Sequence, residues 1–435
     1  MNSPSPVELS TLANGVRVVT ETTPSRVVSV GVWVEVGARD EHDLTNGCSH
    51  FVEHMLFKGT ARRDAHQIAR ELDVMGGAAN AFTATEATCY HATVLADRLP
   101  QLVDLLGDIT LNSRFAPEEV ESEREVILQE IAMVEDTPDD LVHDLFNRQF
   151  WGRHPLGNPV LGPPEVIGAL TPTHVRDFHH RHYTPARFVI VAAGQVEHRR
   201  FRELCEQNWG DQWELSRFSS AAYTGARATV SPRRPPVPPA PSRQVFPRDL
   251  EQVHLVLGAG APPENSPQRY ALHLLNTVLG GNMSSRLFQE IREKRGLAYS
   301  VYSYVSAHSD SGNMGVYLGV DPQSVNEAMA VVVHELQDLG RQQLTAEALT
   351  EARDYARAVI MLAEENMEFR MSRLARNIIT HGRPLPLEEI LGALEKVTAE
   401  EIRQLAGRLF AQPLSALAMG PLEDESLDWG VLDQQ

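Results

Sequence analysis

The two halves of this 435-residue chain repeat one order of predicted elements. In the first half, the helical stretch 165–170 is followed by a second helix and then by the buried strand 189–194. In the second half, the helical stretch 389–394, a helix and the strand 415–420 follow in the same order. The spacings nearly match: 29 residues separate Glu165 from Gly194, and 31 separate Glu389 from Gly420. We infer two copies of one αβ unit.

A proline-rich segment separates the two copies. Six prolines fall within residues 229–242, which is typical of a semi-rigid linker. Beyond it, the strand 253–258 and the helix 270–279 repeat a strand–helix pair of the first half. We therefore expect an N-terminal domain over 1–228 and a C-terminal domain over 243–435, a division that also suits the length of the chain.

One predicted helix of the first copy carries the metal-binding pattern His50-Phe51-Val52-Glu53-His54. His50 and His54 are four residues apart and share a helix face. Two imidazoles can hold one metal ion, while the carboxylate of Glu53 takes a proton from water on that ion. This is the ligand order of the inverzincins. The alternative is two exposed histidines on an ordinary amphipathic helix, and the second copy carries no such pattern.

The helix expected after residue 117 supplies a candidate third ligand. Glu123 and Glu130 are seven residues apart and share a face with Ile127. Carboxylates among apolar side chains are costly unless a positive group meets them. Zinc commonly takes two histidines and one glutamate and keeps an open position, which favours a metal. The alternative is a half-buried face whose acids pair with Arg124.

Composition narrows the partners and the compartment. A net charge of −19 argues against nucleic acid and favours a positively charged substrate if the acids line a cavity. No apolar run is long enough to span a membrane and no secretory signal is visible. Three cysteines without paired spacing, Cys48, Cys89 and Cys205, fit a reducing compartment. We expect a cytoplasmic protein, or a mitochondrial matrix protein if the chain is a mature form.

Over most of its length the chain resembles the pitrilysin-type metallopeptidases, which include insulin-degrading enzyme and the mitochondrial processing peptidase. The stretches that carry the resemblance are 50–60, 123–130, 154–157, 279–288 and 292–299. In that family the third zinc ligand is a glutamate some 76 residues after the second histidine, and Glu130 follows His54 by 76 residues. The resemblance also implies that Glu123 matches an acid that supports catalysis.

The resemblance implies an α+β fold of two homologous αβ domains, each a mostly antiparallel sheet with helices on one side. In the family these domains face each other as half-shells around a chamber. The substrate lies there as an added strand along a segment that Asn80-Ala81-Phe82 resembles. Arg292 and Tyr299 match a substrate-contacting pair from the second domain. Only Gly280-Gly281 remains of the glycine-rich loop of non-catalytic processing-peptidase subunits, so the chain resembles a small, dimeric, catalytic member.

These observations together predict a zinc-dependent metalloendopeptidase. One zinc per chain would be held by His50, His54 and Glu130, with Glu53 as general base. The predicted partners are peptide substrates and a second chain, either identical or a paralogue. Two alternatives stay open, a non-catalytic scaffold of the same fold and a metal-storing or metal-sensing protein. Neither needs the complete ligand set together with a base.

Overall fold

The computed structural model describes residues 7–210, 236 and 240–433, and these pack into two compact units. Unit 1 comprises Met1–Ala132, Asn158–Arg233 and Leu362–Leu385, and unit 2 comprises Met133–Gly157, Arg234–Met361 and Pro386–Gln435. The expected boundaries at 228 and 243 divide the sequence in two, whereas the packing exchanges two segments between the halves. The expected linker 229–242 lies outside the described residues except at 236 and 240–242.

Unit 1 is built on a six-stranded sheet in which only one pair of neighbours, β2 and β6, is parallel. Its strands, in spatial order, are β1 (Val7–Thr11), β2 (Arg17–Thr22), β6 (Phe188–Gly194), β3 (Val27–Val34), β5 (Thr88–Leu95) and β4 (Ala78–Thr83). The central strands are rich in valine and buried on both faces, as expected for a sheet covered on both sides. β4 lies at the edge, paired only with β5.

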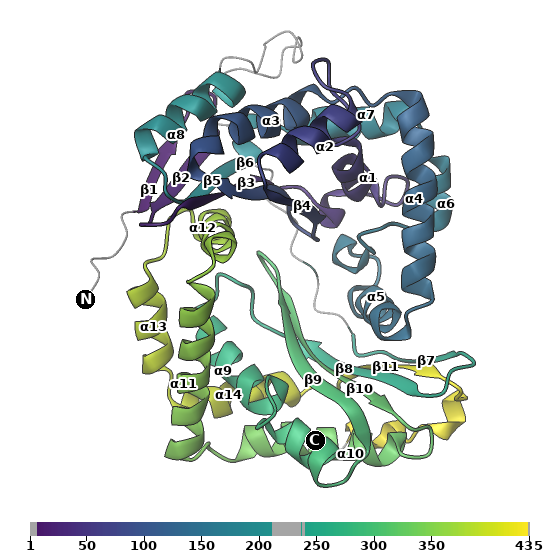
Figure 1. The fold of residues 1–435 in the computed structure, drawn as a ribbon. Helices are drawn as coiled ribbons and strands as arrows, with labels where there is room; N and C mark the ends of the chain where they lie inside the picture. Colours follow the sequence, from purple (N-terminus) through teal and green to yellow (C-terminus); the bar gives the residue numbers. More distant parts are fainter. Residues whose placement is uncertain (1–6, 211–235, 237–239, 434–435) are drawn as a thin grey trace. The chain divides into compact units, whose positions relative to one another are not determined.

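Most helices of unit 1 cover one face of this sheet (Figure 1). They are α1 (Cys48–Met55), α2 (Ala65–Val74), α3 (Leu99–Asn112), α4 (Pro117–Glu135), α6 (Pro164–Ala169), α7 (Pro172–His182) and α8 (His198–Cys205). Alternate strand residues follow the two faces: Val18 and Val32 join this helix-covered core, whereas Val19 and Trp33 point to the opposite face. A single helix, α12 (Met367–His381), packs on that opposite face.

Unit 2 repeats this plan with a five-stranded sheet. In spatial order its strands are β7 (Arg243–Pro247), β11 (Ser415–Gly420), β8 (Val253–Gly260), β10 (Gly312–Val320) and β9 (Ala298–Ala307). β7 and β11 are parallel and the other neighbours antiparallel, so these five match β2, β6, β3, β5 and β4 strand for strand. Its helices on one face include α9 (Arg269–Gly280), α10 (Val325–Arg341), α11 (Ala346–Ala363), α13 (Leu387–Lys396) and α14 (Ala399–Phe410).

The second face of each sheet is covered by a helix from the other half of the sequence. α5 (Pro138–Trp151) packs Val142 and Phe146 against Val256 and Leu417 of unit 2. Conversely, α12 of the second half packs on the sheet of unit 1. The predicted α+β class with two similar units is confirmed, and this exchange adds a helix to the face that was expected to be bare.

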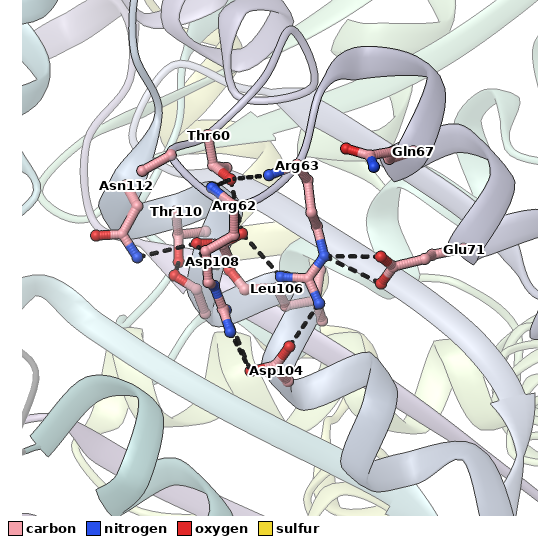
Figure 2. A network of polar contacts seen from close by, with 12 residues as sticks. Thr60, Arg62, Arg63, Gln67, Glu71, Asp104, Leu106, Asp108, Thr110 and Asn112 are labelled. Carbon is pink, nitrogen blue, oxygen red and sulfur yellow. Dashed lines mark hydrogen bonds and ion pairs between the residues drawn. The ribbon is translucent and has the colours of Figure 1, made fainter.

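A polar network of unit 1 fixes the loop that follows α1 (Figure 2). Thr60 Oγ1 and Arg63 Nη1 donate to the buried carboxylate of Asp108 on α3, at 2.7 and 2.8 Å. Asn112 Nδ2 donates to the other oxygen of Asp108 at 3.0 Å. Arg63 Nη2 also donates to Asp104 at 2.5 Å. The loop and α3 are thereby tied together through one buried carboxylate.

We predict that Asp108→Ala lowers the free energy of unfolding by about 3 kcal/mol. This is the lower end of the range for breaking a buried ion pair, because Arg63 keeps Asp104 as a partner. Denaturant titration measures the change, and Asp97→Ala, at an exposed acid in the same unit, serves as the control with a change within about 0.5 kcal/mol. Equal, small effects from both variants would contradict a stabilising network.

The same carboxylate makes stability depend on pH. Burial alone would raise the pKa of Asp108, but hydrogen bonds from Arg63, Thr60 and Asn112 outweigh it and hold that pKa below the ordinary 3.8. Because the folded-state pKa is the lower one, the stabilisation is complete above about pH 4 and is lost as the pH falls through the folded-state pKa. Below pH 4 the wild-type chain should therefore lose its advantage over Asp108→Ala.

Candidate metal centre

The helix α1 presents both histidines of the metal-binding pattern on one face. Phe51, Val52 and Met55 point into the core of unit 1, which fixes the rotation of the helix. The rings of His50 and His54 then lie edge to face with centroids 4.5 Å apart. Burial, and secondarily the proximity of His54, lowers the pKa of His50 to about 3. His50 is therefore a neutral imidazole with a lone pair free for a metal ion.

Glu130 of α4 completes a three-ligand arrangement. One of its carboxylate oxygens, Oε2, lies 3.6 Å from Nε2 of His50 and 3.6 Å from Nε2 of His54. All three candidate ligand atoms lie within 4.8 Å of one another. Two donors bound at about 2.1 Å to one tetrahedral zinc are about 3.4 Å apart, so these separations, too long for hydrogen bonds, fit a shared ion. The structure brings the three predicted ligands together; their role as ligands stays a prediction.

Glu53 lies beside these atoms on α1 and is not part of the three-residue group. Its Oε2 accepts a hydrogen bond from Thr83 Oγ1 of β4 at 2.6 Å. Burial raises the pKa of Glu53, and the hydrogen bond from Thr83 offsets this rise only in part. A carboxylate with a raised pKa is a stronger base than an exposed one, which suits proton transfer.

Glu123 of α4 lies behind the histidines and is only 4% exposed. Its Oε2 lies 2.9 Å from Nδ1 of His54, and its Oε1 lies 2.5 Å from Nζ of Lys58. Arg124 does not pair with this acid, since it pairs with Glu121 and donates to backbone carbonyls. The alternative in which Arg124 neutralises the acids of α4 is therefore wrong.

A buried carboxylate that the sequence reasoning missed holds the other end of α1. The residue before the helix is Gly47, which has a left-handed backbone and no side chain to cap the helix. Glu41 caps the helix instead, accepting from the backbone N–H of Ser49 at 2.6 Å and from the backbone N–H of Gly47 and Nδ2 of Asn46 at 2.8 Å each. Burial raises the pKa of Glu41 to about 7 against these hydrogen bonds. No spacing rule could have found Glu41, because it lies outside the helix.

The predicted substrate strand Asn80-Ala81-Phe82 lies within the edge strand β4. Ala81 packs against the helix-covered core of unit 1. Phe82 points to the other face, where its ring contacts Trp33 and His91 at centroid distances of 5.4 and 6.1 Å. Thr83 shares the face of Ala81, and the alternation of a strand could have revealed that it reaches Glu53.

Arg292 and Tyr299 belong to unit 2 and contact each other. Arg292 lies in the short π-helix η6 (Phe288–Glu293), and Tyr299 lies in β9. The guanidinium of Arg292 donates to the carbonyl of Tyr299 at 3.0 Å and lies 4.4 Å from the centre of its ring. Tyr299 is nonetheless 77% exposed. The break expected at Gly296 is present, since this residue has φ = 62° between the helix and the strand.

The fold and this site define a class, the α+β proteins with an inverzincin arrangement of two histidines, a nearby glutamate and a distant third ligand. The chain belongs to peptidase family M16. Residues 17–164 match the family Insulinase (Peptidase family M16), and residues 169–355 match the Peptidase M16 inactive domain. All residues of the metal centre fall in the first segment, whereas Arg292 and Tyr299 fall in the second.

Similar proteins of known sequence span nearly the whole chain. It is 41% identical over 414 residues to an uncharacterized zinc protease of Mycobacterium tuberculosis, covering 95% of this chain and 92% of that protein. It is 36% identical over 412 residues to the uncharacterized zinc protease YmxG of Bacillus subtilis, covering 94% and 97%. The predicted closeness to the small processing peptidases stays a prediction.

A solved structure shares the fold. The crystal structure of a protease from Helicobacter pylori superposes with a TM-score of 0.87 at 20% identity, covering 96% of this chain and all of that chain. Among the described residues, no helix is both long and apolar enough to cross a membrane. All three cysteines are buried and free, which confirms the expectation that they form no disulfides.

Proposed function

We propose that this protein is a zinc-dependent metalloendopeptidase that hydrolyses peptides or unstructured segments. The observation that carries the proposal is the approach of Glu130 Oε2 to Nε2 of both histidines, with the carboxylate of Glu53 beside them. A scaffold protein has no use for this set. A storage or sensor protein has no use for a carboxylate that is buried next to the ligands without belonging to them.

In the proposed reaction, His50, His54 and Glu130 would hold the zinc. Bound zinc lowers the pKa of a water molecule towards neutrality and polarises the scissile carbonyl. Glu53 takes the proton from the attacking water and then delivers it to the nitrogen of the leaving amine. Thr83 orients the Glu53 carboxylate through its hydrogen bond.

The free edge of β4 offers a place for the substrate. An extended peptide can add there as a further strand through backbone hydrogen bonds, which tolerates varied side chains. We propose that Asn80, Ala81 and Phe82 form this edge, in a chamber enclosed by the two units as in the family. The proposal extends to a cytoplasmic dimer, formed with an identical chain or a paralogue, because small family members work in pairs.

The test is hydrolysis of a panel of quenched fluorescent peptides by metal-free and zinc-restored protein. The expected result is cleavage that disappears with the metal and returns on addition of about one equivalent of zinc per chain. Stoichiometric zinc without cleavage of any peptide would favour the storage or sensor alternative. Absence of both zinc and cleavage would favour the scaffold.

Unit 2 is expected to contribute to substrate binding through Arg292 and Tyr299. Arg292→Ala and Tyr299→Phe should each lower kcat/KM by about 10-fold or more, as for groups that position a substrate, with zinc content unchanged. Lys294→Ala is the matched control, because Lys294 lies in the same charged run and pairs with Glu290 on the surface. Steady-state kinetics decides: equal, small effects from all three would make the run a solvated charged surface.

A further inference from the structure

Lys58 has no assigned role, although it lies directly behind the metal centre. It follows α1, and its backbone N–H donates to the carbonyl of Met55 at 3.1 Å. The next residue, Gly59, accepts a hydrogen bond from the backbone of Arg114 at 3.0 Å, and Thr60 is held by the Asp108 network. The backbone at Lys58 is thus fixed on both sides, and its side chain reaches from an ordered base.

The side chain of Lys58 ends on Glu123. The two oxygens of this carboxylate have separate partners: Oε1 lies 2.5 Å from Nζ of Lys58 and Oε2 lies 2.9 Å from Nδ1 of His54. Because an ionised carboxylate only accepts hydrogen bonds, Nδ1 of His54 carries the hydrogen and Nε2 keeps its lone pair towards Glu130. The carboxylate therefore selects both the tautomer and the orientation of the ring.

Control of this kind is present at one of the two histidines. Nδ1 of His50 is buried and has no hydrogen-bond partner among the described residues. The orientation of the His50 ring comes from packing alone, whereas that of His54 depends on a carboxylate. Outer partners of metal-bound histidines commonly alter metal affinity by 10–100-fold, so the partner of Glu123 also bears on the ion.

A buried carboxylate needs a cation to hold its place. Glu123 is nearly inaccessible, and in the described part of the chain Lys58 and His54 are its ion-pair partners. The bond to Lys58 fixes one oxygen, and the rigidity of the carboxylate plane then fixes the other against His54. Lys58, with its side chain 31% exposed, is accessible enough to be replaced without opening the core.

We propose that Lys58 is a positioning residue that, through Glu123, holds His54 in its metal-binding orientation and so sets the affinity for zinc. The inference rests on the proposed function. The competing explanation is a partly exposed ion pair that adds a little to stability and nothing to the site. The two differ in one measurable quantity, the dissociation constant for zinc of the folded protein.

The experiment compares zinc dissociation constants, measured by competition with a chromophoric chelator, in four variants. Lys58→Met keeps the length of the side chain and removes its charge, and should weaken zinc binding by about 10–100-fold. Lys58→Arg keeps the charge and should recover most of the affinity. Lys294→Met, at a surface lysine paired with Glu290 in unit 2, should bind zinc as the wild type does. Glu123→Gln supplies the second corner of a double-mutant cycle.

If Lys58 acts through Glu123, adding Lys58→Met to Glu123→Gln should weaken zinc binding by less than about 2-fold further. The absorption spectrum of the cobalt-substituted protein, which reports ligand geometry, should change in Lys58→Met and return in Lys58→Arg. An unchanged dissociation constant in Lys58→Met, or fully multiplicative losses in the double variant, would overturn the inference while leaving the proposed function standing. A wild-type chain that binds no zinc would overturn both.

Discussion

Glu53→Gln should retain about one zinc per chain and lose at least about 100-fold in kcat, the scale of one general base. Glutamine has nearly the size of glutamate and can keep a hydrogen bond with Thr83, but it cannot accept the proton of the attacking water. Glu53 lies outside the three-ligand group, so its replacement should leave metal binding intact. Single-turnover kinetics together with metal analysis measures both quantities.

The matched control is Glu125→Gln, at an exposed position of α4 between Glu123 and Glu130. It changes the charge of the chain by the same amount and should leave kcat within about 2-fold, as expected for a surface position. Turnover within a few-fold of wild type in Glu53→Gln would show that another group takes the proton. Loss of zinc from this variant would instead make Glu53 a ligand.

His54→Ala should abolish zinc binding and, with it, peptide hydrolysis. The substitution removes the one ligand whose second nitrogen is held by a carboxylate, and two remaining ligands make a weak site for zinc. Metal analysis after gel filtration measures the zinc content, and near-stoichiometric zinc in this variant would refute the ligand assignment. His66→Ala, at an exposed histidine of α2, is the control and should keep both zinc and activity.

The candidate ligands could be predicted because their spacing is local or carried by the resemblance. His50 and His54 share a face through the period of one helix, and Glu123 and Glu130 do so on another. Which of the two acids would face the histidines directly was implied by the family spacing alone. The structure separates them: Glu130 Oε2 lies near Nε2 of both histidines, whereas Glu123 lies at Nδ1 of His54.

The supporting residues could not be predicted in this way. Glu41 caps α1 from outside the helix, Thr83 reaches Glu53 from a strand, and Lys58 reaches Glu123 across 65 residues of sequence. Their partners are fixed by the packing of α1 between α4, α7 and the sheet. No periodicity of one element records such contacts.

The sequence by itself determined the repeated order of elements, the two-unit α+β architecture and the face of α1 that carries the histidines. These follow from hydrophobic periodicity and from spacing within single helices and strands, which are local properties. Only the tertiary structure decided that α5 and α12 exchange between the units and that Glu123 pairs with Lys58 and His54 rather than with Arg124. Such pairings depend on which surfaces meet when non-local segments pack, and that is set by the whole core rather than by any one stretch of chain.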